Sequence, residues 1–484
     1  MPMRIVTSPG TVDTPASSTA PQASRFPPEA LLYGASLAAS VVVAAAVTTR
    51  ARYVLGLFAL ALLIAVLRKW PVTIWAFGLA VCVFLGESTR VIVQAGSLSI
   101  YLSDLVPVLI IIGAASAGRL GSVRSSWVRF PMQSAIAFFI IVLLEVFRTF
   151  SAYGLTFGLQ ARVLWPLIIM VTLPGMKSFS AIKSRHVASV ISLAAIALAL
   201  RTLYLLVTGT ESVYGHGAQA GTTSLAVLGV QRVFQTWEPF IGAGMGLILL
   251  AYVLGAKHVT RLHYVGLAVS PIPVLFGFFR TSWVIFGLLS ILLLIFMKES
   301  QRRGAILAGV MAMCILFAAG ALLTQKVPTY ASQFQKRFAE IHVHLDTYRV
   351  QEYSAVWAEI KKEVVFGQGF GTNYVGGFTD VRSFAHNAYE WLWWRVGLIG
   401  LLPFIFLLVS SVVGGLTRNR YLGDRDDRAL ATGLVAAIMF TALAANLHEN
   451  FESNQSNLFI GLIFAELFAL HAYARKGHTT NSHS

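Results

Sequence analysis

The chain has few charged residues for its length. Only 12% of its 484 residues are Asp, Glu, Lys or Arg, whereas 56% are hydrophobic. An ordinary soluble domain carries about 25% charged residues. Apolar runs recur from Ala30 to the C-terminus, many of them near the roughly 20 residues that a helix needs to cross a bilayer. This composition argues against a series of soluble domains and predicts a polytopic membrane protein.

Cysteines and metal-binding motifs are also scarce. Cys82 and Cys314 both lie in apolar runs, far apart in the sequence, so they predict neither a disulfide framework nor a metal site. Residues 325–388 contain no Asp-x-Asp motif of metal-dependent nucleotide binding. His342 and His344 form an H-x-H pair without a third ligand. We therefore expect no metal and no cofactor.

Nucleotide and nucleic-acid signatures are missing as well. The sequence "GQGFG" from Gly367 is not followed by Gly-Lys-Ser/Thr and is not set in a strand–turn–helix unit, so it predicts a tight turn. The formal net charge is +16. No basic helix interleaved with aromatic residues accompanies it, and the cytoplasmic loops of membrane proteins are themselves rich in Lys and Arg. We expect no nucleic-acid partner.

The apolar runs predict an all-α fold, a polytopic transmembrane helix bundle of about fourteen spans. The expected spans are 30–49, 53–68, 71–87, 99–117, 132–150, 154–176, 187–208, 237–256, 262–279, 281–297, 303–324, 389–413, 429–447 and 456–474. The expected organisation is a disordered cytoplasmic tail (1–29), spans 1–11 (30–324), an extracytoplasmic loop (325–388), spans 12–14 (389–474) and a second cytoplasmic tail (475–484). The first tail has no apolar segment before Leu31 that would act as a signal peptide.

The distribution of charge predicts the orientation. Alternate loops such as "GRLGSVRSSWVR" from Gly118 are basic and fall on one side if both termini are cytoplasmic. The long segment from Thr324 to Asn387 then lies outside. Its sequence "TYRVQEYSAVWAEIKKEVVF" has apolar residues at helical spacing, which predicts an amphipathic helix on the membrane surface or on the bundle.

Arginines gather where this orientation places the outer ends of the spans. They are Arg148, Arg162, Arg201, Arg232, Arg280 and Arg382, with His386 and Asn387 nearby in the last loop. An intramembrane charge is costly and marks a functional site by default. Arginines at span ends also extend toward lipid headgroups. Because the guanidinium group binds phosphate in a bidentate way, we favour an anion site for phosphate or pyrophosphate.

Four segments of the sequence resemble the O-antigen ligase and polymerase superfamily of bacterial envelope polysaccharide enzymes. They are "VFGQGFGTNYVGGF…FAHNAYEWLWWRVGLIGLLPF", the preceding "YRVQEYSAVWAEIKKEVVFGQGFG", "FFRTSWVIFGLLSILLL" and "QRVFQTWEPFIGAGMGLILL". The similarity covers approximately residues 98–470, and its distinctive part is the His-Asn segment. Phe279 stands where the family usually has serine, and Trp237-Glu238-Pro239 departs from its asparagine-containing version.

The resemblance implies an inverting, metal-independent glycosyltransferase at the outer face of the bacterial inner membrane. Its donor would be a glycan on undecaprenyl pyrophosphate, and its acceptor a glycan or a lipid core. His386 matches the family's loop histidine, Arg280 and Arg162 match its core arginines, and Arg232 matches a further position. Membrane lipids, a flippase and a chain-length regulator are the other expected partners.

These matches give a mechanistic hypothesis. Arg280 and Arg162 stabilise the departing pyrophosphate. The residues expected to help bind the donor are Arg148, Arg201, Arg232, Arg382 and Asn387, and Asn387 also holds the loop. His386 acts either as general base or, protonated, as a phosphate contact. Among acceptors we favour polymerisation over ligation to lipid A core, since fourteen spans is a large number for a ligase. A lipid flippase or transporter is the alternative from another class, although no internal repeat supports it.

Overall fold

The computed structural model describes the greater part of the chain. The described residues are 52–84, 91–95, 98–117, 125–154, 158–208, 237–277, 280–296, 306, 309, 347–375, 381–382, 385–446, 451 and 453–473. Several sequence expectations lie outside them: both tails, the span 30–49, most of the span 303–324, and residues Arg232, Cys314, His342 and His344.

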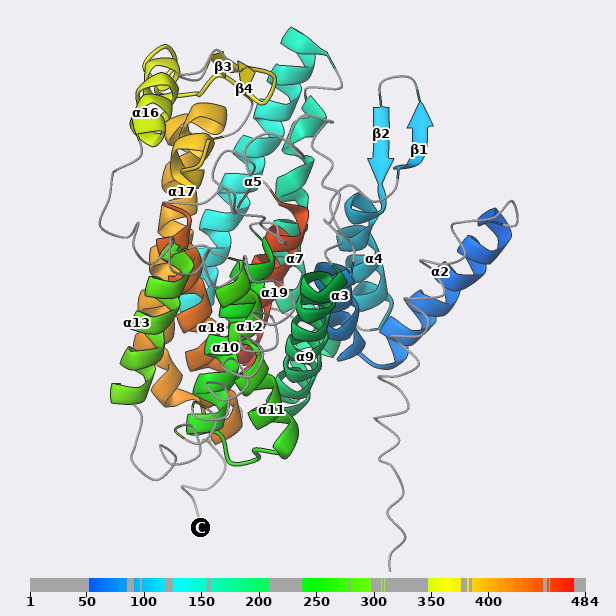
Figure 1. Cartoon of the computed structure of the whole chain (residues 1–484). Coiled ribbons are helices and arrows are strands. Elements are labelled where there is room, and N and C mark those ends of the chain that lie inside the picture. The colour runs from blue at the N-terminus through cyan, green and yellow to red at the C-terminus, as the bar shows by residue number, and fades with distance from the viewer. Residues whose placement is uncertain are drawn as a thin grey trace, which may run out of the picture.

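Six described helices are long and apolar enough to cross a membrane. They are α5 (Ser126–Tyr153), α9 (Ser184–Thr208), α10 (Trp237–Gly255), α17 (Ala388–Arg418), α18 (Arg425–Ala444) and α19 (Asn454–Tyr473). Their long axes run roughly together in one bundle (Figure 1). The chain is thus a helical membrane protein, as the hydropathy predicts, but the expected count of fourteen spans is not confirmed.

Shorter helices complete the described bundle. They are α2 (Arg52–Lys69), α3 (Thr73–Phe84), α4 (Leu102–Ala117), α8 (Lys177–Ser180), α11 (Arg261–Val269), α12 (Pro271–Phe276), α13 (Arg280–Phe296), α16 (Thr347–Ile360) and the 3-10 turn η6 (Asn419–Tyr421). The expected spans 53–68, 71–87 and 281–297 correspond to α2, α3 and α13. The helix α2 extends away from the bundle at one side (Figure 1).

Prolines divide two of the expected spans. The range 154–176 contains the 3-10 helix η1 (Leu159–Ile168), the short α7 (Ile169–Thr172) and η2 (Leu173–Gly175). Pro166 and Pro174 lie within these pieces. Likewise, the range 262–279 splits into α11 and α12 immediately before Pro271. Proline lacks the backbone N–H and clashes with the preceding turn, so a continuous α-helix does not form there.

A short hairpin replaces the start of another expected span. The strand β1 (Val91–Ala95) pairs antiparallel with β2 (Leu98–Tyr101), and α4 begins only after the second strand. Its register sets Val93 opposite Ile100 and Ala95 opposite Leu98. The β-branched run at Val91–Val93 favours an extended strand, and this local preference explains why the expected span starting at 99 is wrong at its first residues.

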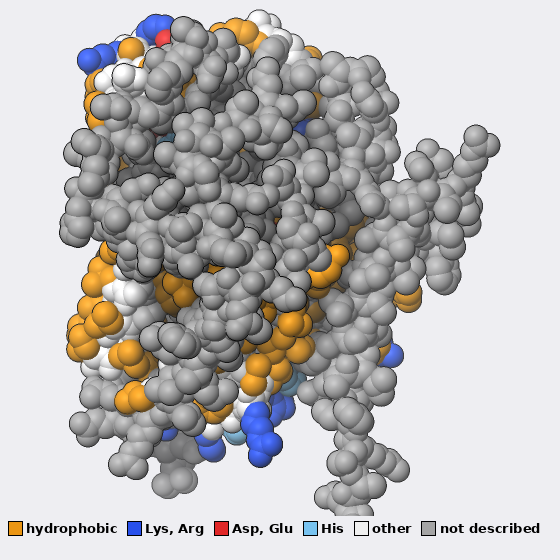
Figure 2. All heavy atoms as spheres, viewed as in Figure 1, with side chains coloured by type: hydrophobic (Ala, Val, Ile, Leu, Met, Phe, Trp, Pro, Cys, Tyr) orange, Lys and Arg blue, Asp and Glu red, His pale blue; other side chains and the backbone are white. Residues whose placement is uncertain are grey.

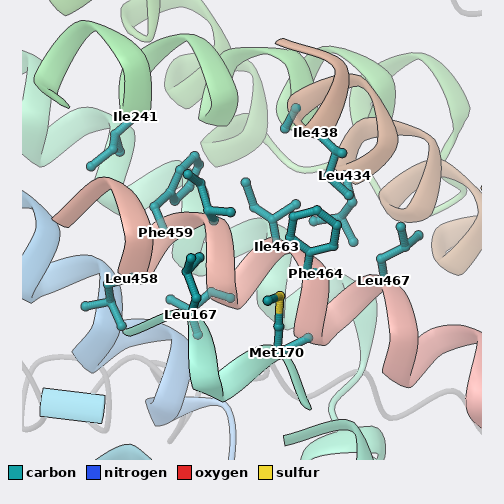
Figure 3. Close-up of a cluster of buried hydrophobic side chains, with 14 of the residues drawn as sticks. Leu167, Met170, Ile241, Leu434, Ile438, Leu458, Phe459, Ile463, Phe464 and Leu467 are labelled. Carbon is teal, nitrogen blue, oxygen red and sulfur yellow. The ribbon is translucent and has the colours of Figure 1, made fainter. Parts of the chain in front are cut away.

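The core of the bundle lies between α10, α18 and α19. In Figure 3, Ile241 of α10, Leu434 and Ile438 of α18, and Phe459 and Ile463 of α19 gather in one cluster. Gly433 lets α18 approach the backbone of α10, since a Cβ there would meet the backbone of Ile248. Hydrophobic side chains also cover much of the visible described surface, and Lys and Arg lie toward both its upper and its lower end (Figure 2). Such a surface suits contact with lipid.

The amphipathic helix α16 and a second small hairpin sit at one end of the bundle. The strands β3 (Tyr374–Val375) and β4 (Val381–Arg382) pair there, beside the beginning of α17 (Figure 1). Val356 and Ile360 of α16 are buried, whereas Val350 and Tyr353 are exposed. The predicted helix is present and α16 packs on α17. The buried face of α16 includes Val356 and Ile360 but not Val350 and Tyr353, which the apolar pattern predicts on the same face.

Candidate functional site

The candidate site is built around a break in α17. At Gly397, φ is 68° and ψ is −178°, a conformation that interrupts the helix and favours glycine. Backbone N–H groups freed by a break in a membrane span need new partners. The N–H groups of Leu398 and Ile399 donate to the carbonyls of Val364 and Val365 over 3.1 and 3.2 Å. The loop after α16 thus caps the second half of α17.

The glycine turn closes the other side of the break. The N–H groups of Gln368 and Gly369 donate to the carbonyls of Trp394 and Arg395 over 2.7 and 3.0 Å. Gly367 and Gly369 have φ of 71° and 83°, and a Cβ on Gly367 would collide with the backbone of Gly397. The predicted tight turn at "GQGFG" is confirmed, and its glycines permit the close approach to α17.

Two arginines hold the carbonyl groups of this turn. Arg148, near the end of α5, donates through Nη2 to the Gly367 carbonyl and forms an ion pair of 2.8 Å with Glu145. Arg395 is 1% exposed and donates through Nη1 to the carbonyls of Gly369 and Thr372 over 3.0 and 2.7 Å. The structure therefore gives Arg148 a role in loop packing. Its contact with the lipid-linked glycan substrate stays a prediction.

His386 forms a pair with Glu352 of α16. The Nδ1 atom of His386 lies 2.7 Å from Oε2 and 2.9 Å from Oε1 of Glu352. The Tyr374 hydroxyl donates to Oε1 over 2.9 Å, and the backbone N–H of His386 donates to the same oxygen over 3.3 Å. The side chain of Glu352 is 6% exposed and that of His386 is 35% exposed. A buried carboxylate thus fixes a half-exposed imidazole.

The environment of Glu352 favours its charged form. Burial acts to raise the pKa of Glu352, but the hydrogen bonds from His386 and Tyr374 and the charge of His386 outweigh it, so the pKa lies below its usual value. An ionised carboxylate only accepts hydrogen bonds, so Nδ1 of His386 carries a proton in this pair. In the neutral imidazole the lone pair is then on Nε2.

Asn387 caps the helix that follows. Its Oδ1 accepts hydrogen bonds from the N–H groups of Tyr389 and Glu390 over 3.0 and 3.3 Å. This is the usual action of an N-cap residue, which satisfies helix donors that lack a partner. The start of α17 is also joined to the end of α18, where Ala388 N donates to the Ala445 carbonyl over 2.8 Å. Asn387 therefore stabilises the beginning of α17, the helix that follows His386.

Two other predicted arginines are paired with acids. Arg162 of η1 lies 3.7 Å from Asp104 of α4, with a side chain that is 25% exposed. Arg201 of α9 forms an ion pair with Glu238 of α10 and lies over the ring of Trp237 at 5.3 Å. The Glu238 side chain is 1% exposed. The carboxylate of Glu238 thus has Arg201 as its counter-charge, while the donor-binding role of Arg201 stays a prediction.

A chain of contacts joins η1 to the start of α17. Asn457 of α19 donates through Nδ2 to the carbonyls of Val163 and Phe451 over 2.6 and 2.8 Å. The ring of Phe451 in turn packs edge-on against Tyr389 at 6.3 Å. The residue after Arg162 is therefore connected through α19 to the helix that begins beside His386.

The O-antigen ligase family model matches residues 265–405. This segment is similar to the O-antigen ligase family. The resemblance to the O-antigen ligase and polymerase superfamily is thereby confirmed, and it supports a transferase activity. Among curated proteins, none matches the chain.

The matched segment includes some of the predicted site residues. Arg280, Arg382, His386 and Asn387 lie within it, whereas Arg148, Arg162, Arg201 and Arg232 lie outside. Arg280 is the first residue of α13, and the backbone of Arg382 pairs in β4 opposite Tyr374, the residue that binds Glu352. The side chains of Arg280 and Arg382 are outside the described part. In that part, no group of three His, Cys, Asp or Glu side chains is placed to hold a metal ion.

Sequence reasoning missed Glu352, Tyr374 and Arg395. A signal for Glu352 was present, because it precedes Val356 and Ile360 at intervals of four on the buried face of α16. An acid on the apolar face of an amphipathic helix requires a partner. Tyr374 and Arg395 gave no comparable signal, since their contacts depend on how the loop docks on α17.

Proposed function

We propose that this protein is a membrane glycosyltransferase whose donor is a glycan carried on undecaprenyl pyrophosphate. The observation that carries the proposal is the His386–Glu352 pair at the beginning of α17, inside the segment that matches the O-antigen ligase family. A buried carboxylate that orients an imidazole is the arrangement of a general base, since it fixes the ring and its tautomer. The outer face of the inner membrane is the proposed location.

The proposed reaction is a single displacement with inversion. The acceptor hydroxyl attacks the anomeric carbon, the bond from that carbon to the phosphate oxygen breaks, and the hydroxyl proton passes to Nε2 of His386. Negative charge grows on the departing diphosphate, and we propose Arg280 and Arg162 as the groups that stabilise it. Preorganised donors at such a developing anion typically contribute about 2.7–4 kcal/mol each. Arg148, Arg201, Arg232 and Arg382 remain proposed donor-binding residues.

The test is release of undecaprenyl pyrophosphate by purified protein supplied with a lipid-linked glycan. We expect release by the native chain, and a loss of about 10²–10⁴ in rate for His386→Ala, the usual contribution of a general base. The same assay with EDTA should show full activity. Near-normal turnover of His386→Ala would refute the catalytic assignment, and transfer of intact donor across the bilayer without release would identify a flippase.

Polymerisation and ligation share this donor chemistry and differ in the acceptor. We propose polymerisation of glycan units, with ligation to lipid A core as the alternative. The glycan that accumulates in a deletion strain separates them, because a missing polymerase leaves single repeat units whereas a missing ligase leaves long unligated chains.

A further inference from the structure

Three consecutive apolar side chains are exposed in the loop after α16. Val364, Val365 and Phe366 are 39%, 47% and 52% exposed. Lys361, Lys362 and Glu363, which precede them, are exposed too. We call Val364, Val365 and Phe366 the tip. Leaving apolar surface of the tip in water costs about 25 cal/mol of free energy per Å² relative to burying it.

Hydrogen bonds fix the depth of this tip along α17. The carbonyls of Val364 and Val365 accept from the N–H groups of Leu398 and Ile399. Leu398 follows the N-cap Asn387 by about three helical turns, roughly 15 Å at a rise of 1.5 Å per residue. The tip therefore lies about one third of the way along the 34-residue apolar span Ala388–Tyr421.

The lateral position of the tip agrees with this depth. The exposed apolar residues of α17 recur at intervals of three and four, and they are Leu402, Phe406, Val409, Val413 and Leu416. This spacing defines one face of a helix. Continued toward the helix start, the same face passes through Leu398 and Ile399, the residues that bind the tip. The tip and the lipid-facing stripe of α17 thus form one continuous apolar surface.

The side chain of Trp393 contacts the tip. The ring nitrogen of Trp393 donates to the Val364 carbonyl over 3.0 Å, and the Trp393 ring packs edge-on against Trp357 of α16 at 5.1 Å. Tryptophan is enriched at the boundary between headgroups and acyl chains. The Val364 carbonyl, the Val365 carbonyl and the backbone N–H of Gly367 all have hydrogen-bond partners, which hold this part of the loop against α17.

We infer that the tip, Val364, Val365 and Phe366, is a re-entrant lip that inserts among the acyl chains of the leaflet next to His386. It is called the lip below. Lys361 and Lys362 then lie at the level of the headgroup phosphates of that leaflet. The partner is the phospholipid bilayer itself, and the inference does not depend on the reaction that the protein catalyses.

Collision measurements on spin labels test the lip directly. The background is the full chain with Cys314→Ala, in which Cys82 is retained because it is buried. Single labels are placed at Val365→Cys and Phe366→Cys in the lip. Leu402→Cys serves as the lipid-facing reference, and Ser354→Cys, on an exposed part of α16, serves as the aqueous reference. The protein is reconstituted in vesicles of phosphatidylethanolamine and phosphatidylglycerol.

We expect the two lip labels to collide with oxygen several-fold more than with a water-soluble nickel complex, as the Leu402 label does. The Ser354 label should show the opposite preference. Preferential collision with nickel at both lip positions would overturn the inference by placing the lip in water. Low collision with both reagents would overturn it as well, because another part of the chain would then cover the lip.

Discussion

At the scale of single residues, Glu352 combines burial with three hydrogen-bond donors. The donors are Nδ1 and the backbone N–H of His386 and the hydroxyl of Tyr374. The three bonds favour the charged carboxylate and hold the imidazole in one orientation. Glu352 is thus a positioning residue, and its effect on activity passes through His386.

Glu352→Gln tests this positioning role. The amide keeps the size of the side chain but also offers donors, so it no longer selects the Nδ1 proton of His386. We expect turnover to fall by about tenfold or more, less than the 10²–10⁴ for loss of the base itself, with KM for the lipid-linked donor unchanged. Tyr374→Phe is the matched control, since it removes one bond worth about 0.5–1.5 kcal/mol and leaves the imidazole–carboxylate contact. An unchanged turnover for Glu352→Gln would remove Glu352 from the mechanism.

The lowered pKa of Glu352 predicts a pH-dependent contribution to stability. A carboxyl group with a lower pKa in the folded than in the unfolded state stabilises the fold fully above its unfolded pKa, which is 4.5 here. That contribution is lost as the pH falls from 4.5 through the lower folded value. The difference in melting temperature between the native chain and Glu352→Gln should therefore be largest near neutral pH and shrink below pH 4.5. A difference that stays constant from pH 7 to pH 3 would contradict this assignment.

Arg201 offers a test that separates structural from donor-binding roles. Arg201→Ala leaves the buried Glu238 without its counter-charge, and breaking a buried ion pair typically costs about 3–5 kcal/mol. We expect a low protein level in membranes and a reduced melting temperature. Arg201→Ala combined with Glu238→Gln should restore both, because the uncompensated charge is gone. Activity of the double variant then decides the role: restored turnover assigns Arg201 to packing alone, and continued loss assigns it to the donor.

At the scale of elements, the join between α16 and α17 depends on glycines in close contact. At Gly397 the positive φ disfavours any other residue, and a Cβ would collide with the Val365 carbonyl. The adjacent hydrogen bond from the Leu398 N–H to the Val364 carbonyl holds the loop close to α17. The geometry of His386 therefore depends on a backbone contact several turns away.

Gly397→Ala should lower both stability and activity. The combination of positive φ and extended ψ at Gly397 is essentially restricted to glycine and costs about 1–3 kcal/mol for a residue with a Cβ, and the collision adds to it. Gly287→Ala is the control, since Gly287 lies in α13 with open space around it and a helical alanine is favoured by up to about 1 kcal/mol. Melting temperature and undecaprenyl pyrophosphate release are the two measurements. A Gly397→Ala protein as stable as Gly287→Ala would show that the break in α17 is not needed.

At the scale of the whole molecule, hydropathy predicted the helices that lie against lipid or in the core. The ranges 132–150, 187–208 and 237–256 correspond to α5, α9 and α10 within a few residues. Hydropathy did not predict the break at Pro166 or the β1–β2 hairpin. Hydropathy is averaged over many residues, so it is insensitive to a single missing N–H group and to a local preference for strand.

The site was predicted in part for a similar reason. His386 and Asn387 stand out as polar residues at the mouth of a span, and Asn387 proves to be a helix cap. The partner of His386 is 34 residues away in sequence and meets it only after α16 docks. Contacts of this kind follow from tertiary packing, and no local pattern identifies both members of the pair.

The orientation of the chain in the membrane is a prediction that can be measured directly. The basic loops predict that both termini face the cytoplasm and that residues 325–388 face outward. A green fluorescent protein fused after Ser484 should fluoresce, and the Ser354→Cys protein should react in intact spheroplasts with a membrane-impermeant maleimide. Labelling that appears only after lysis would reverse the proposed orientation.

The contact between His386 and Glu352 joins two elements that are separate in the sequence. Glu352 belongs to α16, which precedes the broken helix, and His386 immediately precedes that helix. The two side chains therefore meet only when α16 packs on α17. Under the proposed function, a chain in which this packing is lost would keep all its membrane-spanning helices and still lack an oriented base.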